Sequence, residues 1–186
     1  ANITTTITPL ERNRVGINFN IEEGSAAKIK QINLVGANSF SEKELLSQFE
    51  LTTPGLLTWY NKNDQYSRQK LSADLEKLKS FYMNQGYLEF SVESTQVSIS
   101  PNKQDVYITV NIIEGERFQV SSVKLAGEFA IPEDDLRKLV GVKAGDVFSR
   151  EKLNDTTKAI SDRLGKEGYA FANVNAAPEI DKSKRN

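Results

Sequence analysis

Residues 67–71 read Ser-Arg-Gln-Lys-Leu, and residues 149–153 read Ser-Arg-Glu-Lys-Leu. The second stretch follows the first at an offset of 82 residues (149 − 67). At the same offset, Gly86-Tyr87 returns as Gly168-Tyr169. A repeat this long is typical of tandem small domains that each have a core of their own, and not of a solenoid. The chain of 186 residues therefore contains two related units in tandem.

A second set of matches has a larger offset and locates an insertion. Leu34-Val35-Gly36 matches Leu125-Ala126-Gly127, and Glu23-Gly24 matches Glu114-Gly115, in both cases 91 residues apart (127 − 36). The difference of 9 residues (91 − 82) places an insertion in the first copy, around Thr52–Tyr66.

The matches divide the chain into three parts. Residues 25–115 form a complete unit, and residues 116–186 form a partial unit that lacks its last strand. Residues 1–24 parallel the closing strands of the complete unit, so we expect them to be the C-terminal hairpin of a preceding unit. An isolated hairpin is marginally stable in water, and we expect this one to be mobile or held by a neighbour.

Hydrophobic periodicity predicts the order β-α-α-β-β within a unit. The apolar residues Ile29, Ile32 and Leu34 predict a short strand that ends at Gly36. Ser41 with Glu44 forms a capping box at the start of a first helix. A second helix begins at Ser67 and ends at Gly86. Its apolar residues recur at helical spacing at Leu71, Leu75, Leu78 and Tyr82.

Two strands close the unit. In the first of them the apolar residues switch from even-numbered to odd-numbered positions. Residues 106–112 alternate cleanly between apolar and polar. In the preceding strand Phe90 and Val92 are even-numbered, whereas Val97 and Ile99 are odd-numbered. Either a β-bulge near 93–96 returns Val97 and Ile99 to the core face, or they face away from the helices. The fold class is α+β, a three-stranded mixed sheet covered on one face by two helices.

Composition excludes several classes of function. The chain has no Cys and no His, which rules out imidazole bases, thiol chemistry and tetrahedral zinc sites. Its 24 Lys and Arg residues are balanced by 25 Asp and Glu residues, so no basic surface for nucleic acid is expected. No apolar stretch is long enough for a transmembrane helix.

Two motifs have a chemical reading that we weigh against a structural one. Ser67 with Lys70, and Ser149 with Lys152, fit the S-x-x-K signature of serine-lysine hydrolases. The companion motifs of those enzymes are absent, and Ser at a helix start is favoured as a cap. The loop Asn61–Gln65 has oxygen ligands for calcium but lacks the Gly and terminal Glu of a calcium loop. We therefore expect no catalytic, cofactor or metal residues.

The insertion contains an apolar segment with the only Trp of the chain. Trp59 and Tyr60 follow Leu56 and Leu57. The favoured interpretation is that these side chains cover the unit's own small core. The alternative is a contact with a neighbouring unit or a partner, because Trp and Tyr are favoured anchors at interfaces.

The units resemble the POTRA domain. The resemblance rests on Ile-Lys-Gln-Ile-Asn-Leu-Val-Gly (29–36), Gln-Lys-Leu-Ser-Ala-Asp-Leu-Glu (69–76), Phe-Tyr-Met-Asn-Gln-Gly-Tyr (81–87), Ser-Thr-Gln-Val-Ser-Ile-Ser-Pro (94–101) and Val-Asn-Ile-Ile-Glu-Gly (110–115). Each motif is weak alone, but their succession at this spacing is specific, and the resemblance covers essentially the whole chain. It implies a non-catalytic scaffold in the periplasm of a Gram-negative bacterium, in a protein whose only membrane attachment is a C-terminal barrel.

The resemblance also implies partners. POTRA arrays of outer-membrane assembly proteins hold accessory lipoproteins and receive unfolded outer-membrane proteins. A related alternative is the POTRA region of a two-partner secretion transporter, which serves one dedicated client. In the family fold the third strand is central and the second is an edge, which makes Leu88–Ser100 a template for added strands. We expect the partner surface to contain Thr95, Val97, Ile99 and Leu51, with a further loop contact at Trp59 and Tyr60.

Overall fold

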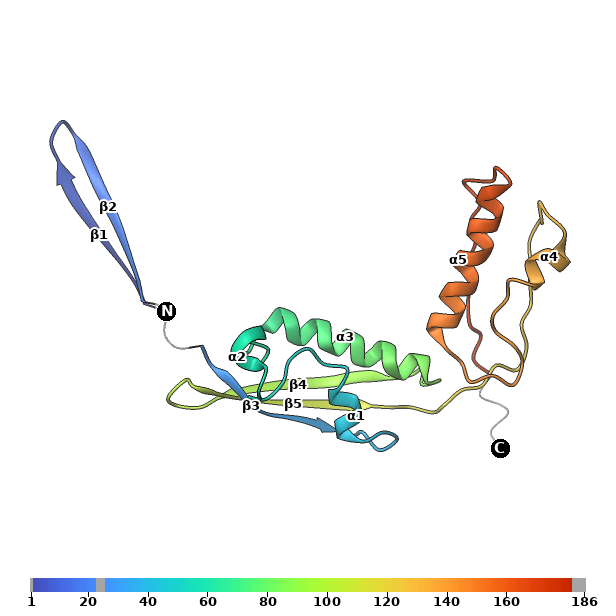
Figure 1. The fold of residues 1–186 in the computed structure, drawn as a ribbon, viewed down its shortest axis with the longest axis horizontal. Coiled ribbons are helices and arrows are strands. Elements are labelled where there is room, and N and C mark those ends of the chain that lie inside the picture. Colours follow the sequence, from blue (N-terminus) through green and yellow to red (C-terminus); the bar gives the residue numbers. More distant parts are fainter. Residues whose placement is uncertain (1, 23–25, 182–186) are drawn as a thin grey trace.

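The computed structural model describes residues 2–22 and 26–181. Figure 1 shows three parts that follow one another along the chain: a hairpin, a unit of sheet and helices, and a pair of helices with long loops. The hairpin consists of β1 (Asn2–Leu10) and β2 (Arg14–Glu22), which pair antiparallel.

The middle part is a complete unit with one three-stranded sheet. Its elements are β3 (Lys28–Val35), α1 (Glu42–Leu46), α2 (Thr58–Asn61), α3 (Arg68–Asn84), β4 (Ser91–Ile99) and β5 (Asp105–Ile113). The strand order is β3-β5-β4. Strand β3 runs parallel to β5 and β4 runs antiparallel to it, so the sheet is mixed as predicted. The short helix α2 was not predicted and lies within the insertion.

One apolar core holds this unit together. The alternating residues of β5 bury every second side chain against α1 and α3, which cover one face of the sheet (Figure 1). The fully buried members include Ile29, Leu45, Leu78, Tyr82, Val106, Ile108 and Val110. The predicted helix starts are confirmed, because the Ser41 hydroxyl accepts a hydrogen bond from the Glu44 N–H and the Ser67 hydroxyl accepts one from the Lys70 N–H.

The hairpin β1–β2 exposes the residues that a complete unit would bury. Val15, Ile17, Phe19 and Ile21 are more than half exposed. Their repeat counterparts, 91 residues further on, are the four buried side chains of β5 between Val106 and Ile112. The strands are therefore those predicted for residues 2–22, while their assignment to a preceding unit stays a prediction. Residues 1 and 23–25 of that predicted part lie outside the described residues.

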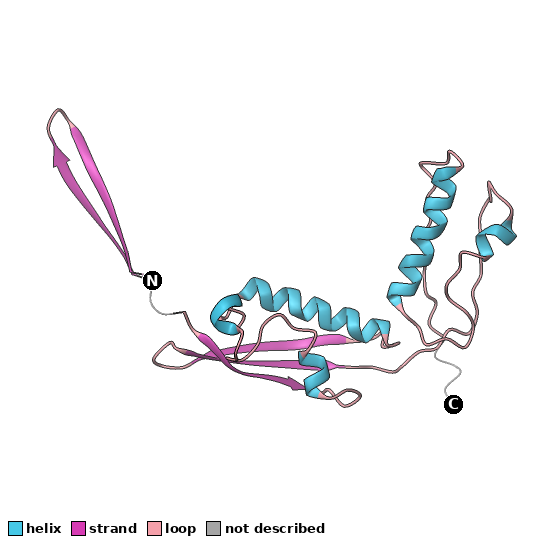
Figure 2. Ribbon diagram, in the orientation of Figure 1, coloured by secondary structure: helices cyan, strands magenta, loops and turns pink. Residues whose placement is uncertain are grey.

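The last part contains the predicted helices but not the predicted strands. Its helices are α4 (Glu133–Arg137) and α5 (Arg150–Lys166). Figure 2 shows no strand beyond β5, and between residues 116 and 181 only an isolated bridge joins Gln119 to Val147. The expectation of strands in this unit was wrong for the described residues. In the complete unit β3 and β4 both pair with β5. Residues 116–181 contain no strand in the place of β5, so neighbouring segments of this range have no strand to pair with.

Candidate functional site

Strand β4 lies at one edge of the three-stranded sheet, as the resemblance implied. Its pairing with β5 shows which backbone groups remain free. The Ser100 N–H donates to the Asp105 carbonyl at 2.9 Å, where the hairpin turns. Hydrogen-bonded pairs alternate along an antiparallel ladder, so the backbone groups of Ser98 and Gln96 also point toward β5. The backbone N–H and C=O groups of Thr95, Val97 and Ile99 therefore face the open edge.

A β-bulge sets the direction of the side chains on this edge. The register of β4 against β5 shifts between Val92 and Ser94. Beyond the shift, Val97 lies opposite Ile108 and Ile99 lies opposite Val106. Side chains directly across an antiparallel pair share a face, and both β5 residues are in the core. The bulge interpretation is confirmed, and the alternative that Val97 and Ile99 face away from the helices is wrong.

The predicted partner surface is therefore only partly accessible. Val97 packs against the core and is half-buried. Ile99 stands at the end of the strand and is 54% exposed, and Thr95 is exposed as well. Ile99 lines a shallow hollow whose other lining residues are Ala27, Ser100, Pro101 and Lys103.

Leu51 does not belong to this surface. Its side chain is 2% exposed and lies in the core. The backbone N–H groups of Glu50 and Leu51 donate to the two carboxylate oxygens of Asp74 at 2.8 and 2.9 Å. This buried carboxylate holds the segment after α1 against α3, and the position of Leu51 at the end of the first helix gave no sign of it.

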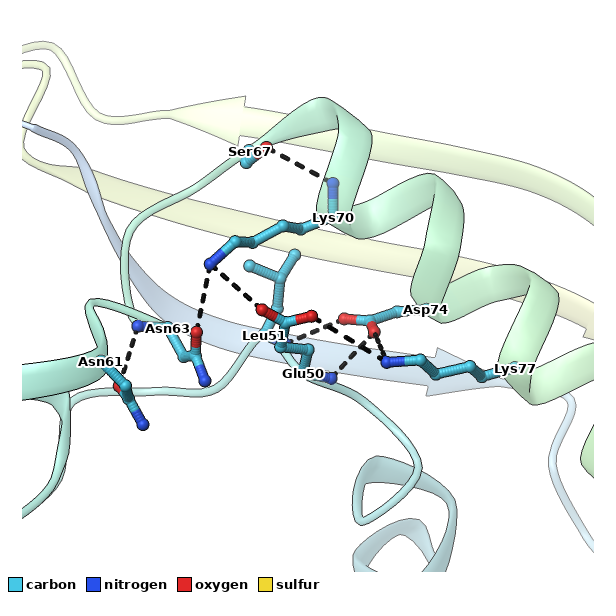
Figure 3. Close-up of polar contacts among 8 residues, drawn as sticks. All are labelled: Glu50, Leu51, Asn61, Asn63, Ser67, Lys70, Asp74 and Lys77. Carbon is cyan, nitrogen blue, oxygen red and sulfur yellow. Dashed lines mark hydrogen bonds and ion pairs between the residues drawn. The ribbon is translucent and has the colours of Figure 1, made fainter.

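Around Asp74 lies a cluster of polar contacts, drawn in Figure 3. Lys77 Nζ lies 3.5 Å from Asp74 Oδ1, and Lys70 Nζ lies 3.3 Å from a Glu50 carboxylate oxygen. Lys70 Nζ also donates to Asn63 Oδ1 at 3.1 Å. The cluster joins the insertion, the segment after α1 and the first turns of α3, so its role is structural.

The two S-x-x-K motifs act as helix caps. The Ser67 hydroxyl accepts the Lys70 N–H at 3.3 Å, and the Ser149 hydroxyl accepts the Lys152 N–H at the same distance. The ammonium group of Lys70 is directed to Glu50 and Asn63 (Figure 3). This geometry supports the capping interpretation of both motifs.

The loop Asn61–Gln65 directs its oxygen atoms to protein groups. Asn61 Oδ1 accepts the Asn63 N–H at 3.0 Å (Figure 3). The buried Asp64 carboxylate lies 3.1 Å from Lys28 Nζ. Within residues 2–22 and 26–181, no group of three or more acidic side chains is placed to hold a metal ion. The polar-loop interpretation fits these contacts.

The apolar side chains of the insertion, at Leu56, Leu57, Trp59 and Tyr60, are exposed to solvent. Trp59 is 81% exposed and Tyr60 is 80% exposed, and their rings meet edge to face at 6.0 Å. Leu56 and Leu57 are exposed as well. The favoured interpretation, that these side chains cover the unit's own core, was wrong, because Thr58 is the residue of α2 that turns inward. The alternative of an external contact stays a prediction.

None of the helices in the described part of the chain is both long and apolar enough to cross a membrane.

Comparison with known proteins gives matches over most of the chain. The family model described as POTRA, surface antigen variable number repeat, matches residues 27–115 and 118–186. Outer membrane protein assembly factor BamA of Neisseria meningitidis serogroup B is 34% identical over 177 residues, covering 95% of this chain and 22% of the relative. BamA of Buchnera aphidicola is 30% identical over 177 residues, covering 94% of this chain and 28% of the relative. The chain thus spans about a quarter of the length of these relatives.

A solved structure supports the same fold. The crystal structure of Haemophilus influenzae BamA POTRA3-5 has a TM-score of 0.72 and 27% sequence identity, and the match covers 88% of this chain and 64% of that one.

Proposed function

The chain belongs to the POTRA family, and from this premise we propose that it is a non-catalytic scaffold in the periplasmic machinery that assembles outer-membrane proteins. The relatives reported above are named as assembly factors, which favours this role over that of a transporter with one dedicated client. The proposed partners are accessory lipoproteins of the assembly complex (BamB-like), unfolded outer-membrane proteins and neighbouring POTRA units.

The observation that carries the proposal is the open edge of β4. An incoming extended segment can pair with the free backbone groups of Thr95, Val97 and Ile99 without any requirement on its sequence. Strands of a nascent β-barrel have unpaired backbone groups and alternating apolar side chains, so they suit such a template. The exposed side chain of Ile99 adds apolar contact at one end of the edge.

The bulge limits where the added strand can pair. Between Val92 and Ser94 the regular ladder is interrupted, and the edge bends there. The regular part of the edge runs from Ser94 to Ile99. We therefore assign the pairing register to Thr95, Val97 and Ile99, and not to the first residues of β4.

Proline substitutions test this assignment. Proline at Thr95 and Ile99 removes two outward N–H donors and leaves the hydrogen bonds to β5 in place. In the Thr95→Pro/Ile99→Pro variant, the loss of two hydrogen bonds worth about 1 kcal/mol each weakens binding by about 30-fold. The probe is a labelled peptide of a single outer-membrane barrel strand, and the measurement is fluorescence anisotropy.

The matched control is Thr95→Ala/Ile99→Ala, which removes the same side chains and keeps both N–H groups. We expect it to bind the peptide far better than the proline variant does. Equal loss in the two variants would assign binding to the side chains. Unchanged binding in the proline variant, with a native circular dichroism spectrum, contradicts strand addition at β4. The same variants can be titrated with the purified lipoprotein.

A further inference from the structure

The two consecutive POTRA units meet at a defined junction. The guanidinium group of Arg150, at the start of α5, donates to Ser80 Oγ at 2.8 Å and lies 3.2 Å from Met83 Sδ. The Glu151 N–H donates to Asn84 Oδ1 at 2.9 Å. The first turn of one long helix is thereby fixed to the last turns of the preceding long helix.

A glycine completes the junction. The Phe118 N–H donates to the Gly86 carbonyl at 2.8 Å. Gly86 has φ +97°, and a Cβ atom there would lie 2.9 Å from Val147 Cγ1 and 3.0 Å from the Phe118 carbonyl oxygen. The turn after the helix must therefore be a glycine for the next unit to approach this closely.

The first unit begins with the same backbone framework. Three backbone contacts of the first unit recur in the second at the repeat offsets. The isolated bridge of Lys28 with Gln65 corresponds to that of Gln119 with Val147. The Tyr66 N–H donates to the Ala27 carbonyl at 3.2 Å, as the Phe148 N–H donates to the Phe118 carbonyl at 3.0 Å, and the Ile29 N–H donates to the Asp64 carbonyl at 2.7 Å, as the Val120 N–H donates to the Asp146 carbonyl at 2.8 Å. The surface that docks in the second unit thus has a counterpart in the first.

In the first unit this surface has no partner within the described part of the chain. Arg68 stands where Arg150 stands in the second unit, and Ala27 stands where Phe118 stands. Arg68 is exposed, and no hydrogen bond or ion pair joins it to any residue of 2–22 or 26–181. The Arg68 guanidinium group, the counterpart of the Arg150 group that holds the observed junction, therefore makes no such contact in the described part of the first unit.

Helix α2 extends this surface with apolar side chains. It precedes α3 at the end where β3 begins, the end toward β2 (Figure 1). The exposed Leu56, Leu57, Trp59 and Tyr60 belong to the insertion, which the second unit lacks. This end of the first unit therefore has exposed apolar side chains that have no counterpart in the second unit.

The hairpin β1–β2 indicates which segment would pack on this surface of the first unit. Strands β1 and β2 expose an apolar face that in the complete unit is covered by helices, and they lead into β3 as β5 leads into the second unit. We propose that Arg68, Ala27 and α2 form the docking surface for the helix end and glycine turn of the POTRA unit that β1 and β2 close. This inference rests on family membership and the observed junction, and it does not depend on the edge of β4.

Cysteine labelling tests the proposal, because the chain contains no Cys. The test compares the 186-residue chain with a chain extended upstream through the helices of the unit that β1 and β2 close, as the natural gene encodes them. In a Tyr60→Cys variant we expect maleimide to react several-fold more slowly in the extended chain. A Lys158→Cys variant, on the exposed side of α5, serves as control and reacts at the same rate in both.

Adding Arg68→Ala to the extended Tyr60→Cys chain separates the polar contact from the apolar one. We expect the reaction rate to rise toward that of the short chain, while the circular dichroism spectrum and peptide binding at β4 stay unchanged. Equal rates at Tyr60→Cys in the short and extended chains overturn the proposal. Protection that survives Arg68→Ala overturns the role of Arg68, and a gene that encodes no helices before the hairpin overturns the occupant.

Discussion

Glu114 connects three segments of the first unit through one carboxylate. It accepts hydrogen bonds from the Asn38 N–H at 2.9 Å, the Ser39 N–H at 3.0 Å and the Tyr82 hydroxyl at 2.8 Å. The end of β5 is thereby joined to the loop after β3 and to α3. Because these contacts come from residues 32 to 76 positions away, the repeated Glu-Gly pair to which Glu114 belongs gave no sign of them.

These contacts shift the pKa values of both partners. Burial alone would raise the pKa of Glu114, but the hydrogen bonds from Ser39, Tyr82 and Asn38 outweigh it and lower the pKa below its ordinary value. Burial, followed by the hydrogen bond to Glu114, raises the pKa of the Tyr82 hydroxyl well above its ordinary value. Both shifts favour an ionised Glu114 beside a neutral Tyr82 at neutral pH.

The Glu114→Gln variant tests this arrangement through pH. The folded chain binds the Glu114 proton more weakly than the unfolded chain does, so the carboxylate stabilises the fold above a pH of about 4.3. That contribution is lost as pH falls through the lower pKa of the folded state. We expect the variant to be less stable at pH 7 by about 1–2 kcal/mol, because several charge-assisted hydrogen bonds are weakened at a partly exposed site.

Urea unfolding at pH 7 and pH 3 measures the effect. The difference between wild type and Glu114→Gln should shrink at the lower pH. Glu76→Gln, at an exposed position of α3, makes the same chemical change and should have little effect at either pH. A Glu114→Gln loss that is equal at both values would show that the charge is not responsible.

At the scale of elements, the segment after the first helix is fixed to the second helix in both units, by different chemistry. In the first unit the Asp74 carboxylate accepts the N–H groups of Glu50 and Leu51. In the second unit the Thr156 hydroxyl, 82 positions after Asp74, accepts the Gly141 N–H at 3.0 Å. A long-range side-chain cap is therefore a repeated feature of the two units.

Removal of this cap should weaken the first unit strongly. In Asp74→Ala two backbone N–H groups lose their acceptor in a buried place, and we expect a loss of about 3 kcal/mol in the free energy of unfolding. Glu50→Ala, which removes an exposed member of the same cluster, should cost less than about 1 kcal/mol. Denaturant titration monitored by circular dichroism compares the two, and equal losses would contradict the role assigned to Asp74.

At the scale of the whole molecule, the junction between units is set by a helix end, a glycine turn and one arginine. Gly86 and Gly168 are repeat counterparts with nearly the same backbone, φ +97° and +92°. A Cβ atom at Gly86 would meet the next unit, whereas a Cβ atom at Gly168 has no heavy atom within 4 Å among the described residues. The two glycines thus share the backbone strain and differ in the junction.

The pair Gly86→Ala and Gly168→Ala separates these contributions. Both variants force an alanine into a left-handed conformation, at a cost of about 1 kcal/mol. Gly86→Ala also crowds Val147 and Phe118, and overpacking should add about 1–3 kcal/mol. Thermal unfolding monitored by circular dichroism gives both values, and equal losses would mean that the junction does not restrict this position.

Much of the fold could be predicted because its signals are local or periodic. The caps at Ser41 and Ser67 depend on residues three positions away, and the alternation along β5 repeats every second residue. The parity change before Val97 left open whether a bulge returns Val97 and Ile99 to the core face or whether they face away from the helices. The candidate edge at β4 could be placed only through the family resemblance, because strand order depends on pairing between distant segments.

The repeat, the order of elements in the complete unit, the lack of thiol and imidazole side chains and the family resemblance all follow from the amino-acid sequence alone. The burial of Leu51, the inward direction of Val97, the exposure of Trp59 and the contact of Arg150 with the preceding unit became known from the folded structure. Burial and pairing depend on which surfaces meet in space. A side chain's own neighbours along the chain specify its local conformation, but they do not specify which distant residues cover it.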